Sequence, residues 1–161
     1  GGWSAAEHWG LTEQIFRSLC VMTTTRPRNR KPVLRKARFE LHTVPSSNFV
    51  GLKTVWRGGT RVQVSDPART LIDMLADPAL AGGIRHLVEM LGSLLHDQPK
   101  EAVKLFDAMV PEFAAGFLAR MRPDAAGAIL AGMRPDNAYA VSVILAGRNA
   151  TVPVPPAASV E

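Results

Sequence analysis

The first candidates for chemistry are polar side chains, two of them carboxylates, that lie within eight residues of one another in the sequence. They are Asp66, Arg69, Thr70 and Asp73. On a helix, Asp66 and Asp73 would share a face but stand roughly 10 Å apart, which is too far to hold one metal ion. Asp66 followed by Pro67 is instead typical of a helix start, with Asp as the cap and Pro at the first helical position. We therefore interpret this segment as structural.

A second candidate is the dense run of cations between residues 26 and 38. Seven of its thirteen residues are basic and none is aromatic. Such a run can neutralise phosphates, with a salt-dependent gain for each contact, or it can form a solvated surface loop. Base stacking is not expected, so any contact would position a nucleic acid rather than read its sequence. The predicted nucleic-acid or acidic-partner contacts are Arg26, Arg28, Arg30, Lys31, Arg35, Lys36 and Arg38.

The remaining reactive residue types form no recognisable centre. Cys20 is the only cysteine, so the chain can form neither an internal disulfide nor a cysteine metal cluster. We predict no enzymatic activity, no metal site, no cofactor and no small-molecule substrate. The histidines lie in separate segments without metal-ligand spacing; they are His8, His42, His86 and His96.

Charge is distributed unevenly along the 161 residues, whose net charge is +5. Residues 1–92 contain 13 Lys and Arg against 7 Asp and Glu, a balance of +6, whereas residues 93–161 contain 6 against 7. This asymmetry indicates a polyanionic partner for the first part only. The single cysteine fits a reducing compartment, and no apolar stretch reaches the length of a membrane span. We therefore expect a cytoplasmic protein without a transmembrane segment.

The first 92 residues are predicted to form an α+β domain with a small mixed or antiparallel sheet and flanking helices. Residues 19–25 and 39–44 are typical of strands, and residues 51–64 predict a hairpin with a two-glycine turn. The basic run would be a loop, or an edge strand with a loop.

Helix signals flank these strands. Ser4 and Glu7 have the spacing of a capping box, which would begin a short helix. Another helix is expected to open at Asp66-Pro67, and a further one after Gly83, because apolar residues then recur at helical spacing. These apolar residues are Ile84, Leu87, Val88 and Leu91.

Residues 93–152 are predicted to form an all-α module of short helices with a period of twelve residues. Each unit has the pattern Met-x-Pro-acid followed by small residues. Proline pre-sets the first helical φ, and the acid complements the positive helix end. The methionines at Met109, Met121 and Met133 either pack in the core of the repeat or form a groove for a partner helix. Residues 153–161 are rich in proline and are expected to be disordered.

Residues 3–92 resemble the C-terminal domain of AbiEi-type antitoxins of type IV toxin–antitoxin systems. The resemblance is carried by SAAEHWGLTEQI (4–15), the arginine-rich stretch, FVG (49–51), VSDPARTLID (64–73) and PALAGGI (78–84). It implies a cytoplasmic transcriptional regulator that opposes a nucleotidyltransferase-like toxin. In that family a winged helix-turn-helix precedes this domain and supplies most DNA binding. We expect that module to be absent here, which would leave toxin binding and auxiliary, weak nucleic-acid contacts.

Residues 97–152 are similar to the helical repeats of flagellar MotE-like proteins and of the MgtE N-terminal domain. The Met-x-Pro-acid units and the segment SVILAGRNA (142–150) carry this similarity. It implies a protein–protein interaction module that binds a flagellar motor or membrane-protein segment, in a periplasmic location for MotE-like proteins. A third alternative is a fused or truncated chain without an independent function.

Overall fold

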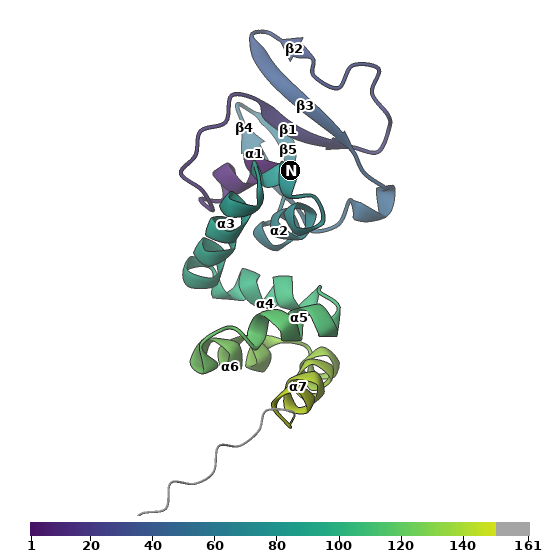
Figure 1. Ribbon diagram of the computed structural model, residues 1–161. Helices are drawn as coiled ribbons and strands as arrows, with labels where there is room; N and C mark the ends of the chain where they lie inside the picture. The colour runs from purple at the N-terminus through teal and green to yellow at the C-terminus, as the bar shows by residue number, and fades with distance from the viewer. Residues whose placement is uncertain (151–161) are drawn as a thin grey trace, which may run out of the picture. The chain divides into compact units, whose positions relative to one another are not determined.

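The computed structural model describes residues 1–150 and divides into two compact units, Gly1–Leu105 (unit 1) and Phe106–Glu161 (unit 2). Unit 1 combines helices with two small sheets, and the described part of unit 2 is helical (Figure 1). The predicted α+β class is therefore confirmed. The proline-rich segment 153–161 lies outside the described residues. No helix within residues 1–150 has the length and apolar character needed to cross a bilayer.

The first sheet of unit 1 contains three strands in the order β1-β3-β2. Strand β1 (Leu19–Thr23) runs parallel to β3 (Ala37–Thr43), and β2 (Val33–Leu34) pairs with β3 in the antiparallel direction. The sheet is therefore mixed, and β1 and β2 lie on opposite edges of β3.

The second sheet is the predicted hairpin of β4 (Leu52–Arg57) and β5 (Thr60–Ser65). Gly58 and Gly59 join the strands with φ values of 53° and 77°. A two-residue hairpin turn with positive φ at both positions matches the right-handed twist of the strands, and glycine adopts it without steric cost.

Helices α1 (Gly2–His8), α2 (Pro67–Ala76) and α3 (Ile84–Asp97) form the core of unit 1 with strand β1 and the 3-10 turn η2 (Pro78–Ala81). A second 3-10 turn, η1 (Ser46–Asn48), follows β3. The core is close-packed, because its central side chains are almost fully excluded from water. They include Ala6, Cys20, Leu71, Met74, Leu87, Met90 and Leu94.

The capping box predicted for the first helix is wrong. Helix α1 begins at Gly2, without a side-chain cap, so Ser4 lies inside it. The Ser4 hydroxyl instead accepts a hydrogen bond of 2.8 Å from the backbone N–H of Cys20. Because Cys20 is buried and its N–H requires a partner, this long-range bond takes the hydroxyl away from the local role.

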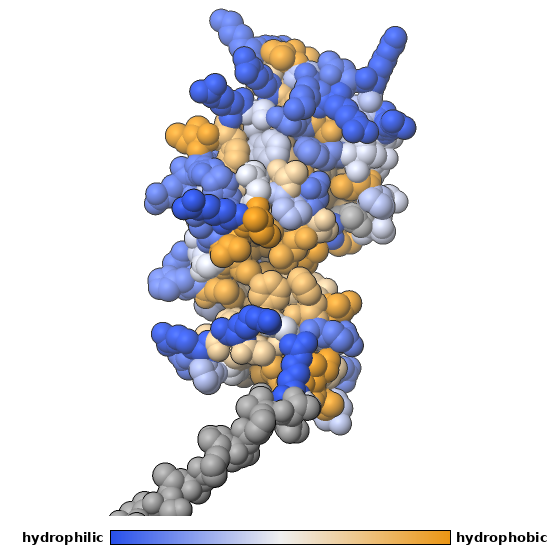
Figure 2. Space-filling model, in the orientation of Figure 1, coloured by the Kyte–Doolittle hydropathy of each residue, from blue (hydrophilic) through white to orange (hydrophobic). Residues whose placement is uncertain are grey.

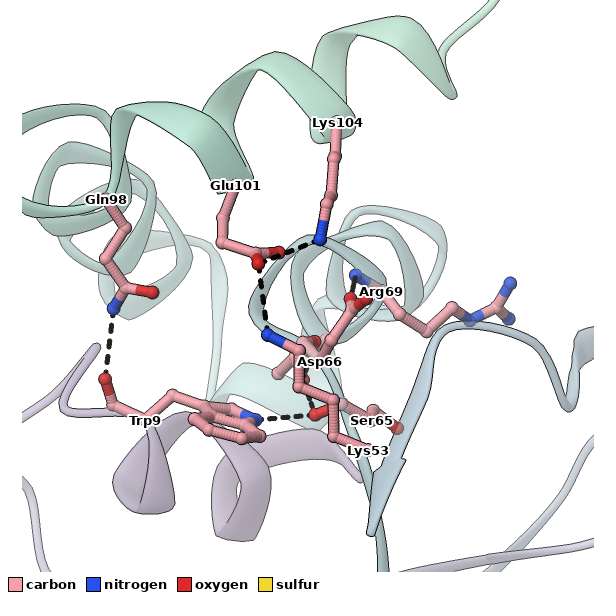
Figure 3. Close-up of polar contacts among 9 residues, drawn as sticks. Trp9, Lys53, Ser65, Asp66, Arg69, Gln98, Glu101 and Lys104 are labelled. Atoms are coloured by element: carbon pink, nitrogen blue, oxygen red, sulfur yellow. Dashed lines mark hydrogen bonds and ion pairs between the residues drawn. The ribbon is translucent and has the colours of Figure 1, made fainter.

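Helix α4 (Pro99–Asp107) is tied through its first turn to the N-terminal part of unit 1 (Figure 3). Gln98 donates from Nε2 to the carbonyl of Trp9 at 3.1 Å. Glu101 Oε1 accepts from Lys53 Nζ at 3.1 Å, and the same ammonium lies 5.1 Å from the centre of the Trp9 ring. Burial alone would raise the pKa of Glu101, but the hydrogen bonds from Lys104 and Lys53 outweigh it and hold this pKa below its ordinary value.

These contacts explain why unit 1 extends to Leu105. Helix α3 runs without a break through residue 92, at which the expected first domain ends. A boundary defined by contacts therefore falls later in the chain than residue 92.

Helix starts in the C-terminal part of the chain recur every twelve residues. Helix α5 (Pro111–Leu118), α6 (Pro123–Gly132) and α7 (Pro135–Ala150) follow α4, and each of the four begins with proline and has an acid in its first turn. Within unit 2, α5 and α6 both pack on α7. Its buried side chains are Phe106, Ala114, Ala115, Leu118, Ile129, Met133 and Val141.

Candidate nucleic-acid interface

The basic run forms a projecting hairpin built on strands β2 and β3. Val33 pairs with Arg38 and Leu34 pairs with Ala37, so Arg35 and Lys36 form a two-residue turn. Outside the ladder, the backbone N–H of Leu41 still donates to the carbonyl of Arg30 at 2.8 Å. Backbone pairing with β3 therefore extends beyond β2 as far as Arg30.

The turn holds its two cations in an unusual backbone conformation. Arg35 has φ 46° and Lys36 has φ 70°, and these are the only residues other than glycine with positive φ among residues 1–150. The left-handed conformation costs an L-residue with a side chain roughly 1–2 kcal/mol, and Asn-Gly is the usual choice. The tip of the hairpin thus carries two long cations at a steric cost.

All seven cations of the run are exposed. In Figure 1, β2 and β3 form one end of unit 1. Figure 2 shows long hydrophilic side chains that project from this end. Val33 and Leu34 between them are also exposed, at 63% and 60%. The hairpin is therefore a ribbon with charged and apolar side chains that face water.

Internal acids neutralise very little of this charge. Within residues 1–150, Lys31 is the only cation of the run that forms an ion pair, with Glu40 at 3.3 Å. A hydrogen bond from Ser18, together with Lys31, holds the pKa of Glu40 below its ordinary value. The other six cations keep their charge available to a partner.

A polar cleft of about 580 Å³ adjoins the root of the hairpin and limits where a phosphate can bind. The cleft is lined by Arg30 and Lys31 and also by three acids, Glu40, Asp73 and Asp77. Carboxylates repel phosphate, so the cleft itself is a poor phosphate site. The outer cations of the hairpin are better placed, because the segment from residue 26 to 38 contains no acid.

The arrangement can bind a polyanion. Guanidinium and ammonium groups neutralise phosphates and release their counterions, and arginine can hold a phosphate with two parallel hydrogen bonds. Among the described residues, no group of three or more His, Cys, Asp or Glu could hold a metal ion.

The motif residues after β5 have structural contacts. Asp66 Oδ1 accepts from the backbone N–H of Arg69 at 2.8 Å and caps α2, with Pro67 in the first turn, as predicted. Thr70 is buried and donates to the carbonyl of Asp66 at 2.8 Å. Arg69 and Asp73 form an ion pair one helical turn apart, with both side chains largely covered.

The three methionines of the repeat differ in burial. Met133 is 7% exposed, and Met109 and Met121 are half-buried. Met133 therefore contributes to the core of unit 2, and the partner groove stays a prediction for the other two.

Burial makes Cys20 a poor nucleophile. Its side chain is 2% exposed, and burial raises the pKa of its thiol to about 11. At neutral pH the thiol is protonated, and the thiolate is the reactive form.

Sequence reasoning missed one exposed aromatic residue in unit 1. Trp56 on β4 is 65% exposed, opposite Arg61 on β5. The alternation of the strand predicted that two faces exist, but it did not indicate which face meets the core. Flanking cations at Arg57 and Arg61 were the available signal.

Comparison of the chain with protein-family models, with curated proteins and with solved structures finds no match. The resemblances to AbiEi-type antitoxins and to MotE-like or MgtE repeats therefore stay predictions.

Proposed function

We propose that this chain is a non-catalytic regulatory protein that binds the phosphate backbone of nucleic acid through the β2–β3 hairpin. The observation that carries the proposal is an acid-free run of seven exposed cations, of which Lys31 alone is in an ion pair among residues 1–150. Arg35 and Lys36 lie at the tip with positive φ. Strained backbone is concentrated at functional sites, which supports a binding role for this tip.

The contact is sequence-independent and depends strongly on salt. Each neutralised phosphate adds about 0.9 to the magnitude of the slope of log affinity against log salt for a duplex. Contact by all seven cations would therefore give a slope of about −6. Arginine and lysine on phosphates fix position without reading bases.

A direct test replaces Arg35 and Lys36 by Asn-Gly, the pair that favours positive φ at both positions of a two-residue turn. In the variant Arg35→Asn with Lys36→Gly, we expect the slope against salt to decrease by about 2 and duplex affinity to fall on the order of tenfold. The same variant should be more stable by about 1 kcal/mol, because the strain at the turn is relieved. Fluorescence anisotropy with a labelled duplex and thermal unfolding measure the two effects.

The matched control removes two exposed cations outside the hairpin, Arg85→Gln with Lys100→Gln. Arg85 is 89% exposed on α3, and Lys100 is exposed on α4. Duplex affinity should change little in this control. An equal loss in both variants would mean that net charge alone drives binding, and capture of acidic peptides without any nucleic acid would replace the proposed partner.

The resemblance of residues 3–92 to AbiEi-type antitoxins supports a regulatory setting for this contact. In that setting the chain acts in the cytoplasm, binds a nucleotidyltransferase-like toxin, and uses the hairpin for auxiliary contacts. Co-expression with such a toxin should restore growth, and the two proteins should co-purify. Unrelieved toxicity without co-purification would remove the antitoxin role while leaving the nucleic-acid contact to be judged by the binding test.

A further inference from the structure

Trp56 is the exposed member of the three tryptophans of the chain. Trp3 is 7% exposed and donates from its ring nitrogen to the Ser18 carbonyl at 2.7 Å. Trp9 donates in the same way to the Ser65 carbonyl at 2.6 Å. Trp56 is 65% exposed, and within residues 1–150 its ring makes no hydrogen bond or aromatic contact. An indole normally packs in a core or an interface, so this ring is available to a partner.

The pairing register of β4 and β5 shows which side chains share each of the two faces of this second hairpin. Successive side chains of a strand alternate between faces, so Lys53 and Arg57 lie opposite to Trp56. Lys53 lies over the Trp9 ring, and Arg57 Nη2 is 2.8 Å from His8 Nδ1, so their face is directed toward the N-terminal segment. The Trp56 face points away from it.

Arg61 lies directly across from Trp56 on that outer face. Thr54 and Gln63 form the next pair, joined by a hydrogen bond of 3.0 Å from Gln63 Nε2 to Thr54 Oγ1. The outer face therefore presents an aromatic ring beside a guanidinium and next to an amide and a hydroxyl.

The hairpin of β4 and β5 is itself positive, and its turn is sterically open. Residues 41–65 include Lys53, Arg57 and Arg61 but no acid. A Cβ added at either glycine of the turn, Gly58 or Gly59, would meet nothing within 4 Å. The hairpin of β4 and β5 therefore contributes cations but no carboxylate of its own to a polyanion that approaches its turn.

We propose that Trp56 and Arg61 form a stacking site for an unpaired base of single-stranded nucleic acid. The indole stacks on the base and Arg61 neutralises an adjacent phosphate. Aromatic rings stack on any base of a single strand, whereas the bases of a duplex already cover one another. The proposal extends the nucleic-acid binding proposed for the β2–β3 hairpin and rests on it only for the class of partner.

Charge favours this occupant over the other partners of an exposed indole. A second copy of the chain would bring Arg61 and its neighbours against the same cations, which is repulsive. A nucleic acid supplies both the flat ring that Trp56 matches and the negative charge that Arg61 matches.

Intrinsic tryptophan fluorescence of the full chain tests the proposal directly. An unlabelled single-stranded oligonucleotide should quench part of the emission in a saturable way. The same strand without bases, which keeps the phosphates, should bind without this quenching, and a duplex should also leave the emission nearly unchanged. Trp3 and Trp9 are covered and serve as the internal reference.

Two substitutions separate stacking from general binding. Trp56→Ala should lower the affinity for the single strand about tenfold and leave the affinity for the duplex unchanged. Trp56→Phe should abolish the quenching but keep most of the affinity, because a ring remains. The matched control is Tyr139→Ala, which removes another exposed aromatic side chain (73% exposed) and should have no effect.

The outcomes distinguish this inference from the proposed function. If no nucleic acid binds, the hairpin function and this site both fail. If single strands bind with a dependence on Arg35 and Lys36 but Trp56→Ala changes nothing, the stacking site alone is refuted. Equal quenching by a base-free strand or by polyglutamate would also refute it, as would quenching that grows with protein concentration in the absence of nucleic acid.

Discussion

At the scale of single residues, Asp107 makes the densest set of polar contacts in the described part of unit 2. Its carboxylate accepts from Arg134 Nε at 2.7 Å and from Asn137 Nδ2 at 2.9 Å, and its carbonyl accepts a second bond from Asn137 at 2.8 Å. Burial alone would raise the pKa of Asp107, but these hydrogen bonds outweigh it and hold the pKa below its ordinary value. The end of α4 is thereby joined to the start of α7.

Replacing this carboxylate should destabilise unit 2 in a pH-dependent way. Asp107→Ala is expected to lower the free energy of unfolding by about 1–2 kcal/mol at neutral pH. A depressed folded-state pKa contributes stability above the ordinary aspartate pKa of about 4, and that contribution is lost as pH falls through the folded value. The difference between variant and parent should therefore shrink in acid, which denaturation at a series of pH values would measure.

The control for this substitution is Asp136→Ala, which removes an exposed acid from the first turn of α7. It should cost only a few tenths of a kcal/mol, as expected for an exposed charge near a helix dipole. A loss as large as that of Asp107→Ala, or a loss independent of pH, would contradict the role given to the Asp107 carboxylate.

At the scale of elements, the helix starts differ in how they are capped. Asp66 caps α2 with its side chain, whereas Val110 precedes α5 without a side-chain hydrogen bond. Val110 already has the extended backbone of a cap residue, with φ −64° and ψ 140°. It is also 64% exposed, so it contributes little to the core.

A cap introduced at this position should stabilise unit 2. Val110→Ser is expected to raise the free energy of unfolding by about 0.5–1 kcal/mol, because the hydroxyl can accept from an unpaired N–H of the first turn. Thermal unfolding followed by circular dichroism would measure the gain. The same substitution at Val143, exposed within α7, should give no gain; equal gains at both positions would exclude capping as the cause.

Elements with a local signal were predicted from the sequence. Gly58 and Gly59 determine the β4–β5 turn through their backbone freedom, and Asp66 with Pro67 determines the start of α2. The recurring prolines predicted the starts of α5, α6 and α7 in the same way. These signals act within a few residues, so they can be recognised in the sequence without knowledge of tertiary contacts.

Features that depend on distant neighbours were not predictable in this way. The pattern in α3 placed Ile84 and Val88 among its apolar residues, but the structure leaves them 64% and 62% exposed and buries Met90 and Leu94 instead. Helical spacing allows more than one apolar stripe, and packing against α2 and η2 selects among them. The parallel pairing of β1 with β3 had no local signal either.

The same distinction applies to the candidate site. The composition of residues 26–38 predicted their exposure, since seven cations cannot be buried without partners. The positive φ of Arg35 and Lys36 could not be inferred, because neither residue type favours it. The exposure of Trp56 depends on which face of β4 meets α1, and the alternation of that strand leaves both choices open.

At the scale of the whole molecule, the contact boundary at Leu105 assigns most of α4, residues 99–105, to unit 1. Leu94 is fully buried, and the bonds from Gln98 to Trp9 and from Lys53 to Glu101 lie beyond residue 92. A fragment that ends at 92 would lose all of these contacts.

We therefore expect a fragment of residues 1–105 to unfold cooperatively, and a fragment of residues 1–92 to be less stable by about 4 kcal/mol. This figure combines the burial of one leucine with two hydrogen bonds. Urea denaturation of both fragments would measure the difference. Equal midpoints would contradict the view that residues 93–105 belong to the first folding unit.

The outward edge of β2 also bears on self-association. A short strand with Val33 and Leu34 facing water would ordinarily offer its unpaired backbone to the strand of another molecule. Arginine and lysine on both sides of this apolar pair make such an approach electrostatically unfavourable, as gatekeeper residues do. When phosphates or concentrated salt neutralise those charges, that protection weakens, so occupancy by a nucleic acid and the aggregation of hairpins at this edge are physically coupled.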